Sequence, residues 1–416
     1  MQWSDTDEMM RQAIREFVDA KIRPHVDELE HGDMPPYELL RTMFTTFGID
    51  KMASEAVAKM LAKQRAREHG ESSDEPKEKS GGGGLLGFGQ ESLGAILCSE
   101  LCKVSMGMFA AMGVSLGLAA ATIASRGTLA QKERWLPSLM TMEKVGAWAL
   151  TEPDSGSDAF GGMKTTVRRD GDGYVLNGQK TFITNGPYAD VTVVYAKLDE
   201  GDGTPIRDRK VLPFVLEKGM DGFTQGKPLR KMGLHSSPTG ELFFDDVRLT
   251  RDNLLGETEE HRSGDGRDSA KAGFVTERLG VAAMALGVIE ECQRLCIDYA
   301  KNRVLWGKPI AEHQLIQLKL AKMEVARINV QNMVFQGIEA ARNGKPPTLA
   351  EASAIKWYSS ETATEVAMDA VQLFGGNGYM AEYRVEQLAR DAKSLMIYAG
   401  SNEVQITQVA RGLLNG

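Results

Sequence analysis

A turn-rich stretch near the middle of the chain, WALTEPDSGSDA at residues 148–159, carries side chains that could bind a small molecule. Thr151, Ser155 and Ser157 offer hydroxyl groups, and Gly156 leaves backbone N–H groups accessible. Such a loop can hydrogen-bond the polar edge of a heterocyclic cofactor or an extended thioester arm. The alternative is an ordinary β-turn without a ligand, and this segment by itself does not decide between the two.

A second candidate for chemistry is the pair Glu277 and Arg278, in GFVTERLGVAA. A carboxylate can act as the general base that removes a weakly acidic proton from carbon. A glutamate in the first turn of a helix also interacts favourably with the helix N-terminus without any catalytic role. Two further candidates also have two interpretations each. Arg303 is either a phosphate ligand or a surface ion pair. Gly375 and Gly376 either permit close approach of a ligand or form a helix C-cap.

Charge and cysteine content exclude several classes of function. The formal net charge is −8 with a pI near 5.5, and no concentrated basic face is evident, which argues against a nucleic-acid partner. The four cysteines fall in two pairs, Cys98 with Cys102 and Cys292 with Cys296. No histidine or further cysteine nearby completes a tetrahedral set, so we expect buried free thiols, no zinc and no disulfide.

The N-terminal residues, MQWSDTDEMM, lack both the apolar core of a signal peptide and the arginine-rich pattern of a transit leader. No uninterrupted apolar run reaches the roughly 18 residues that a membrane span needs. The sequence therefore predicts a soluble cytoplasmic protein. Its 416 residues favour two or three domains.

The pattern of apolar residues changes twice along the chain that must position these candidates. Helical spacing of apolar residues predicts two amphipathic helices over 5–46, a further helix over 51–68 and more helices over 91–142. Short β-branched and aromatic runs between turn residues predict a compact β domain over 145–250. After a polar loop at 257–270, helical spacing suited to a bundle returns over 273–302, 312–343, 348–374 and 382–413.

The predicted domains are therefore 1–142, 143–252 and 253–416, in the order α, β, α. The polar, Gly-rich composition of 69–84 predicts a mobile loop. No repeat period indicates a solenoid, and no G-x-G-x-x-G lies between a strand and a helix, which removes the main argument for a dinucleotide-binding Rossmann domain.

Four further segments join the 148–159 loop: NGQKTFITNG, RVLWGKPIAEHQ, QLFGGNGY and RDAKSLMIYAGSNEVQ. In this order, the five segments resemble the acyl-CoA dehydrogenase family over nearly the whole chain outside 50–90. The resemblance implies an α+β fold with an N-terminal helical domain, a middle β-barrel-like domain and a C-terminal helical bundle. It also implies FAD as cofactor, an acyl-CoA substrate, electron-transfer flavoprotein as electron acceptor, and a homotetramer in which a neighbouring subunit completes each flavin site.

Carried over position by position, the resemblance assigns residues to the cofactor and to the substrate. Phe182 would stack beside the flavin ring, and Arg303 would bind phosphate. The implied cofactor-binding residues are Trp148, Leu150, Thr151, Gly156, Ser157, Phe182, Ile183, Thr184, Arg303, Trp306, Gln314, Gln372, Gly375, Gly376, Ser401 and Glu403. The implied substrate-binding residues are Ser157, Phe274, Arg278, Tyr398 and Gly400.

The catalytic base is where this chain departs from many members of the family. They carry a glutamate in the segment that aligns with IYAGS, but here Ala399 occupies that place, and its methyl group accepts no proton. Isovaleryl-CoA and long-chain acyl-CoA dehydrogenases instead have a glutamate before an arginine on the first C-terminal helix. The resemblance thus implies that Glu277 removes the α-proton while FAD accepts the β-hydride, giving trans-2-enoyl-CoA, a reaction of fatty acid β-oxidation. We expect substrate binding to raise the pKa of this base by excluding water from a largely apolar pocket.

Two regions differ from the family pattern. The 51–90 stretch replaces a segment that lines the acyl pocket and could be a lid, a partner contact or a neutral insertion, of which the last is favoured. The 256–273 loop looks longer than usual, and Val275 replaces a polar residue often used near CoA. Small residues after Glu277 predict tolerance of medium, long or branched acyl chains. The alternative functions are a flavin monooxygenase or nitroalkane-oxidase-like enzyme on the same fold, and a non-catalytic flavin-binding subunit.

Overall fold

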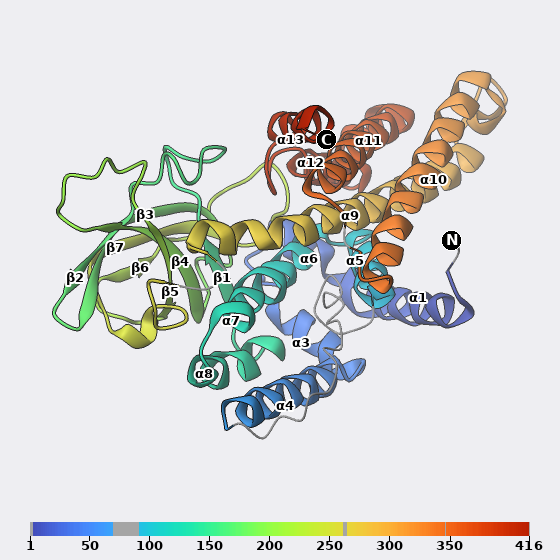
Figure 1. Cartoon of the computed structure of the whole chain (residues 1–416). Coiled ribbons are helices and arrows are strands. Elements are labelled where there is room, and N and C mark those ends of the chain that lie inside the picture. The colour runs from blue at the N-terminus through green and yellow to red at the C-terminus, as the bar shows by residue number, and fades with distance from the viewer. Residues whose placement is uncertain (1–2, 70–90, 261–263, 346, 416) are drawn as a thin grey trace.

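The computed structural model describes residues 3–69, 91–260, 264–345 and 347–415. The predicted order is confirmed: helices form both ends of the chain, and a curled sheet lies between them in sequence (Figure 1). In Figure 1 the sheet occupies one side of the molecule and the C-terminal helices the other. The predicted mobile loop at 69–84 falls outside the described residues except for His69.

The N-terminal domain consists of short helices. They are α1 (Asp5–Phe17), a π-helical turn (Val18–Ile22), a 3-10 turn (Arg23–His25), α2 (Val26–His31), α3 (Tyr37–Thr46), α4 (Ile49–Glu68), α5 (Glu91–Cys102), α6 (Met106–Gly113), a π-helical stretch (Val114–Ala120), α7 (Ala121–Arg126) and α8 (Leu129–Met140). Ser4 begins α1 with a capping box, because its side chain accepts from the Asp7 N–H and the Asp7 carboxylate accepts from the Ser4 N–H.

The prediction of two helices over 5–46 was wrong, since the structure has three α-helices there. Pro24 lies in the 3-10 turn between α1 and α2, and its ring nitrogen has no N–H to continue an α-helical ladder. The predicted helix over 51–68 is confirmed as α4. Its Val57 and Leu61 pack into one apolar cluster with Trp135 and Leu136 of α8.

The middle domain is a seven-stranded sheet. Its strands are β1 (Gly146–Ala149), β2 (Thr166–Asp170), β3 (Gly173–Thr184), β4 (Val191–Asp199), β5 (Val211–Glu217), β6 (Phe223–Gln225) and β7 (Thr239–Leu249), in the order β1-β4-β2-β3-β7-β6, with β5 also paired to β4. The first half of β4 pairs parallel with β1, its end pairs parallel with β2, and its other edge pairs antiparallel with β5. Every β4 residue except the last is buried, which explains why most of its residues are apolar.

The C-terminal domain is a helical bundle. It contains α9 (Gly266–Asn302), the short strands β8 (Val304–Leu305) and β9 (Lys308–Pro309), a 3-10 turn (Ile310–Glu312), α10 (Gln314–Arg342), α11 (Leu349–Phe374), a 3-10 turn (Gly375–Tyr379), α12 (Val385–Ser394) and α13 (Asn402–Asn415). Two predictions need correction. The 257–270 loop ends early, because Asp265 caps a helix that begins at Gly266. The helical spacing over 382–413 is broken between α12 and α13, where Ala399 and Gly400 have positive φ.

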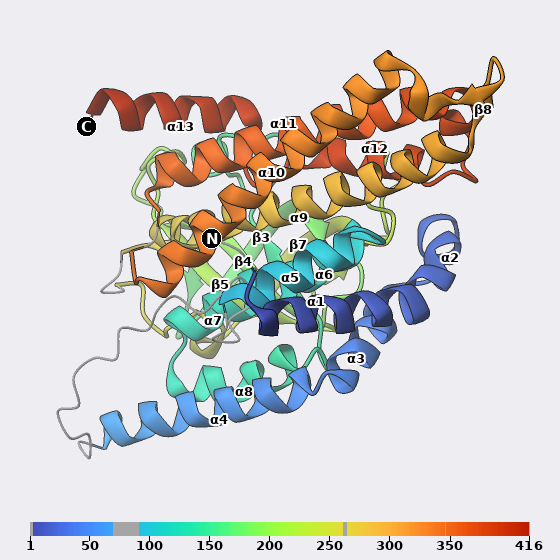
Figure 2. The same ribbon diagram turned by 90° about the vertical axis from the view of Figure 1, so that its right-hand side faces the viewer.

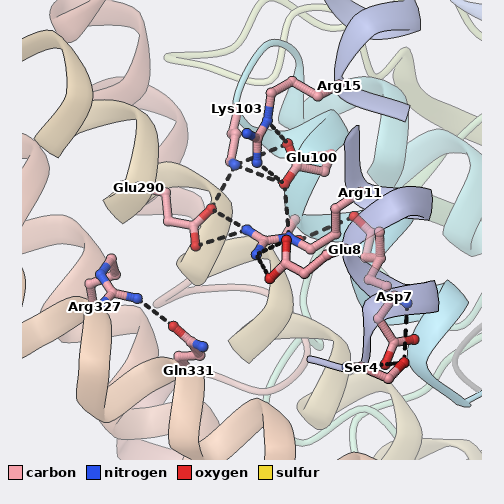
Figure 3. A network of polar contacts seen from close by, with 12 residues as sticks. Ser4, Asp7, Glu8, Arg11, Arg15, Glu100, Lys103, Glu290, Arg327 and Gln331 are labelled. Carbon is pink, nitrogen blue, oxygen red and sulfur yellow. Dashed lines mark hydrogen bonds and ion pairs between the residues drawn. The ribbon is translucent and has the colours of Figure 1, made fainter. Parts of the chain in front are cut away.

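Helix α9 runs from the sheet to the far end of the bundle (Figures 1 and 2). It lies close to α5 at Gly287, where an added Cβ would lie 2.3 Å from the Ser99 carbonyl oxygen. A network of ion pairs also joins α1, α5 and α9 (Figure 3). Glu100, whose side chain is fully buried, pairs with Arg15 at 3.0 Å and with Lys103 at 2.8 Å, and Lys103 reaches Glu290 at 2.6 Å. These contacts fix α9 relative to the N-terminal domain.

Two segments of the described chain, Met106–Arg126 and Gly266–Asn302, are long and apolar enough to span a membrane. Most of each apolar window, 61% and 65%, is buried inside the protein, which is the behaviour of core helices. The four cysteines are likewise buried and carry free thiols.

Candidate active site

Glu277 and Arg278 lie three turns into α9, where the helix passes beneath the loop that joins α12 to α13. Glu277 is partly buried and Arg278 is buried. The Arg278 guanidinium donates to Ser353 Oγ of α11 at 3.0 Å and lies 5.5 Å from the centre of the Phe274 ring. Its Nε is also buried and has no hydrogen-bond partner among the described residues.

The loop from Tyr398 to Ser401 faces this pair. A Cβ on Gly400 would lie 3.9 Å from Arg278 Nη2, which places the glycine directly beside the guanidinium. The Tyr398 hydroxyl donates to Met284 Sδ of α9 at 3.4 Å. The structure thus brings together Glu277 and four of the predicted substrate contacts: Phe274, Arg278, Tyr398 and Gly400.

The pKa of Glu277 is raised to about 7 already in the protein without substrate. Burial is the main cause, because it penalises the charged carboxylate. The cations Arg278 and Lys356 act in the opposite direction and lower the pKa, but they do not outweigh burial. A carboxyl group with this pKa exchanges protons readily near neutral pH, which is the property that a general base needs.

This pKa predicts how activity depends on pH. Only the ionised Glu277 can accept a proton, so kcat/KM should rise as the pH increases through about 7 and level off above it. Initial rates with an artificial electron acceptor across this range would measure the profile. A profile that stays flat down to pH 4.5, the ordinary pKa of a glutamate, would contradict it.

The effect of pH on stability has the opposite sign. Because the folded state favours the neutral carboxyl group of Glu277, this group's contribution to the free energy of unfolding is lost as the pH rises from 4.5 through 7.

A second group of predicted residues gathers on the sheet. Phe182 projects from β3 with 66% of its surface exposed and a φ of +57°, at an irregularity in the β3–β7 pairing between Lys180 and Ile183. The Thr181 N–H donates to the Thr151 carbonyl at 2.9 Å, so the 148–159 loop lies beside this bulge.

Other residues of this group differ in exposure. Trp148 Nε1 donates to the Tyr195 hydroxyl at 3.3 Å, which fixes the indole. Gly156 and Ser157 are exposed, and nothing lies within 4 Å of a Cβ added to Gly156. Leu150 and Ile183 are buried. Of the remaining predicted residues, Thr184 ends β3, while Ser401 precedes α13 and the exposed Glu403 lies in its first turn.

A third group lies at the other end of α9. Arg303, Trp306 and Gln314 are exposed around the β8–β9 hairpin, and Trp306 has 88% of its surface exposed. Tyr299 stacks on Phe374 with ring centroids 4.0 Å apart, which brings the exposed Gln372, Gly375 and Gly376 to the same end. About 25 residues of α9 separate Glu277 from this end, or about 38 Å of helix. A single chain therefore does not bring these six residues to Glu277.

Sequence reasoning missed the buried charges that support the site. Lys180 of β3 donates to the Leu150 carbonyl at 3.0 Å and to Glu152 Oε1 at 2.8 Å, and both side chains are buried. Lys356 of α11 is fully buried and reaches the 398–402 loop. The sequence could have identified Lys356 as buried, because it has the helical spacing of Ala352, Ser359 and Ala363, which lie on the buried face of α11.

The domains match known sequences in the same order. Residues 49–143, 147–247 and 264–414 match the N-terminal, middle and C-terminal domain models of acyl-CoA dehydrogenase. An acyl-CoA dehydrogenase from Bacillus subtilis is 35% identical, and the match covers 98% of each chain. The chain belongs to the acyl-CoA dehydrogenase family. As a member of this family it is a flavoprotein oxidoreductase that uses FAD to dehydrogenate acyl-CoA.

Two further relatives match this chain over its whole length. The structure of butyryl-CoA dehydrogenase from Megasphaera elsdenii is similar with a TM-score of 0.80 and 34% identity, covering 100% of this chain and 99% of that one. A subunit of the caffeyl-CoA reductase-Etf complex from Acetobacterium woodii is 34% identical, covering 100% of this chain and 99% of that protein.

The residues present in this acyl-CoA dehydrogenase fit FAD. The exposed Phe182 ring beside the Thr151 loop offers an apolar plane next to hydrogen-bonding groups, which suits a flat heterocycle. The open space at Gly156 leaves the backbone accessible. Arg303 supplies an exposed guanidinium for a diphosphate, but it lies at the far end of α9.

Proposed function

We propose that Glu277 is the catalytic base of this acyl-CoA dehydrogenase. The observation that carries the proposal is a partly buried carboxylate with a pKa near 7, beside the loop in which Ala399 leaves no acid. On binding, a thioester would exclude water from the site, and the carboxylate would then face an acidified α-proton. Glu277 Oε takes this proton, and the electron pair of the broken C–H bond forms the new C=C bond.

FAD, when bound, supplies the oxidant that accepts the β-hydrogen with its electron pair. The protein residues do the rest. Burial favours the neutral carboxyl group that Glu277 becomes after proton transfer, so the product state is stabilised relative to water. Arg278 is held by Ser353 and faces Gly400, which fixes the geometry around the base. Phe274 covers the guanidinium and shields it from solvent.

The reaction is tested by mixing the FAD-loaded protein anaerobically with butyryl-CoA, octanoyl-CoA and isovaleryl-CoA. We expect flavin bleaching and one equivalent of the trans-2-enoyl-CoA, detected by mass spectrometry. Acyl chain length and branching would be ranked by the bleaching rates. If no thioester bleaches the flavin, and a nitroalkane or another substrate consumes oxygen instead, the oxidase or monooxygenase alternative replaces this proposal. A flavin that responds to neither class would indicate a binding subunit.

We also propose that electron-transfer flavoprotein reoxidises the reduced enzyme and that the protein works in the cytoplasm. A relative that forms an Etf complex supports the first point. Reduction of purified electron-transfer flavoprotein that depends on acyl-CoA would test it, and the same electrons passing only to oxygen would contradict it. Fractionation of cells, with the protein found in the membrane or in an exported fraction, would contradict the cytoplasmic location.

We propose a homotetramer in which a neighbouring subunit supplies Arg303 to the FAD bound near Glu277. The separation of about 38 Å along α9 supports this, because one chain does not bring both ends of the helix to one cofactor. The C-terminal bundle also exposes many large apolar side chains, as an unpaired interface does. They include Trp306, Leu315, Leu318, Val325, Tyr379, Leu413 and Leu414. Sedimentation velocity would reveal a tetramer, and a monomer that binds FAD fully would contradict the proposal.

Arg303→Gln is expected to weaken FAD binding by about 10- to 100-fold, since a charge-assisted hydrogen bond contributes roughly 1.5–3 kcal/mol. The measurement is FAD affinity by fluorescence titration of the apoprotein. Because Arg303 would contact the diphosphate of FAD and not Glu277, the pH profile of the FAD-saturated variant should match that of the wild type. Lys301→Gln, an exposed cation on the same helix end, is the matched control. Equal FAD affinity in both variants would exclude Arg303 as a phosphate ligand.

A further inference from the structure

Lys356 is an unusual residue to find fully buried in a helical bundle. Burial of an ammonium group is costly unless its donors find acceptors. Lys356 Nζ donates to the Gly400 carbonyl at 2.9 Å and to Asn402 Oδ1 at 2.8 Å. The Asn402 amide oxygen also accepts from Ser360 of α11 at 3.1 Å. The lysine therefore joins α11 to the start of α13 through the loop that faces Glu277.

The turn that Lys356 contacts contains a residue in a strained backbone conformation. Ala399 has a φ of +56°, a conformation that costs a residue with a Cβ about 1–2 kcal/mol. Gln405, fully buried in α13, donates to the Ala399 carbonyl at 3.0 Å and to the Gly400 carbonyl at 2.8 Å. Lys356 and Gln405 thus bind the Gly400 carbonyl from two helices and keep the turn in its strained form.

The charge of the same ammonium group also acts on the proposed base. Arg278 and Lys356 are the two cations whose charges lower the pKa of Glu277. Around Lys356, the charged groups are Arg278 and Glu277 on α9, Glu403 on α13 and Glu361 on its own helix. Burial, and next the Arg278 charge, lower the pKa of Lys356 to about 8, so it is still mostly protonated at neutral pH.

We infer that Lys356 is a positioning residue for proton abstraction: its hydrogen bonds from α11 fix the Ala399–Gly400 turn beside Glu277, and its positive charge acts on this carboxylate. The inference rests on the proposed role of Glu277. Two consequences follow from it. Loss of the ammonium group lets the turn relax, which lowers kcat. Loss of its charge also favours the protonated form of Glu277, which moves the acidic limb of the pH profile to higher pH.

The test compares Lys356→Met, Lys356→Arg and the control Lys393→Met, an exposed lysine at the end of α12, as FAD-loaded proteins. For Lys356→Met we expect kcat to fall about 10-fold and the acidic limb of kcat/KM to move up by about one pH unit, the low end of the effect of a neighbouring charge. Lys356→Arg keeps the charge but alters the hydrogen bonds, so it should lower kcat and leave the limb in place. Lys393→Met should change neither.

The outcomes separate this inference from the proposed function. If Glu277→Gln stays active, the base assignment fails whatever the lysine variants show. If Glu277→Gln is inactive but Lys356→Met keeps the wild-type limb, only the inference about Lys356 is overturned. Should Lys356→Met not fold, Lys356→Arg and Lys356→Gln decide the matter. Equal limbs in these two, at the wild-type position, would show that the charge has no role and would overturn the inference.

Discussion

Glu277→Gln is expected to slow flavin reduction by acyl-CoA by about 10²- to 10⁴-fold, the range that a well-placed general base contributes. Glutamine keeps the size and hydrogen-bonding shape of the side chain, but its amide does not take up a proton at neutral pH. The buried environment that raises the pKa of Glu277 should accept the neutral amide without strain. FAD content and thermal stability should therefore match those of the wild type. Stopped-flow absorbance under anaerobic conditions measures the rate.

Two variants sharpen the interpretation of this result. Glu403→Gln removes an exposed carboxylate in the first turn of α13, an implied FAD contact, so it should weaken FAD binding but leave the FAD-saturated protein most of its activity. Glu277→Asp keeps the carboxylate but withdraws it by one methylene, so its activity should lie between those of the wild type and Glu277→Gln. If Glu403→Gln is the slower of the two glutamine variants, the base lies on α13 and the assignment to α9 is wrong.

Lys180→Met is expected to destabilise the protein by about 3–5 kcal/mol, because it leaves Glu152 as an unpaired buried charge. Lys180 is fully buried, and burial lowers its pKa to about 8 against the raising effect of Glu152. The Glu152 carboxylate also accepts hydrogen bonds from the backbone N–H groups of Lys164 and Thr165. These bonds hold the carboxylate in its buried position, where water does not replace the lost lysine. Denaturant unfolding of the FAD-loaded protein measures the loss of free energy.

This variant should also lose FAD, because Lys180 donates to the Leu150 carbonyl and so anchors the 148–159 loop. Lys164→Met is the matched control: Lys164 pairs with Asp154 at the surface, where an ion pair contributes about 0–1 kcal/mol. The double variant Glu152→Gln with Lys180→Met removes both charges and should recover part of the stability. A Lys180→Met protein as stable as Lys164→Met would contradict the importance of the buried pair.

The sequence predicted those elements of the fold whose patterns are long. Strands β3, β4, β5 and β7 were found because their β-branched and aromatic runs are bounded by turn residues. Strands β1, β2 and β6 were missed, because β1 and β6 have at most four residues and β2 ends in three polar ones, RRD. The start of α9 was missed because the capping box at Asp265 lies within a polar stretch that resembles a loop.

The candidate site was predicted as a set of residues but not as an arrangement. The resemblance to the family selected Glu277 and the loop around Gly400, and the structure places them together. It also selected Arg303, whose distance from Glu277 depends on the uninterrupted length of α9. Lys356 and Lys180 were missed because a lysine is rarely fully buried, so neither was singled out from the sequence. Their roles depend on contacts between segments far apart in the sequence.

The length of α9 has a consequence for how defects in different copies of the chain combine. In the proposed assembly, each α9 provides the base of its own site and Arg303 of the neighbouring site. A chain with an inactive Glu277 still donates a sound Arg303 to its neighbour, and a chain with a defective Arg303 still keeps a sound base. A chain defective at Glu277 and a chain defective at Arg303 would therefore complement each other in a mixed pair. One of the two sites then receives an intact base from one chain and an intact arginine from the other.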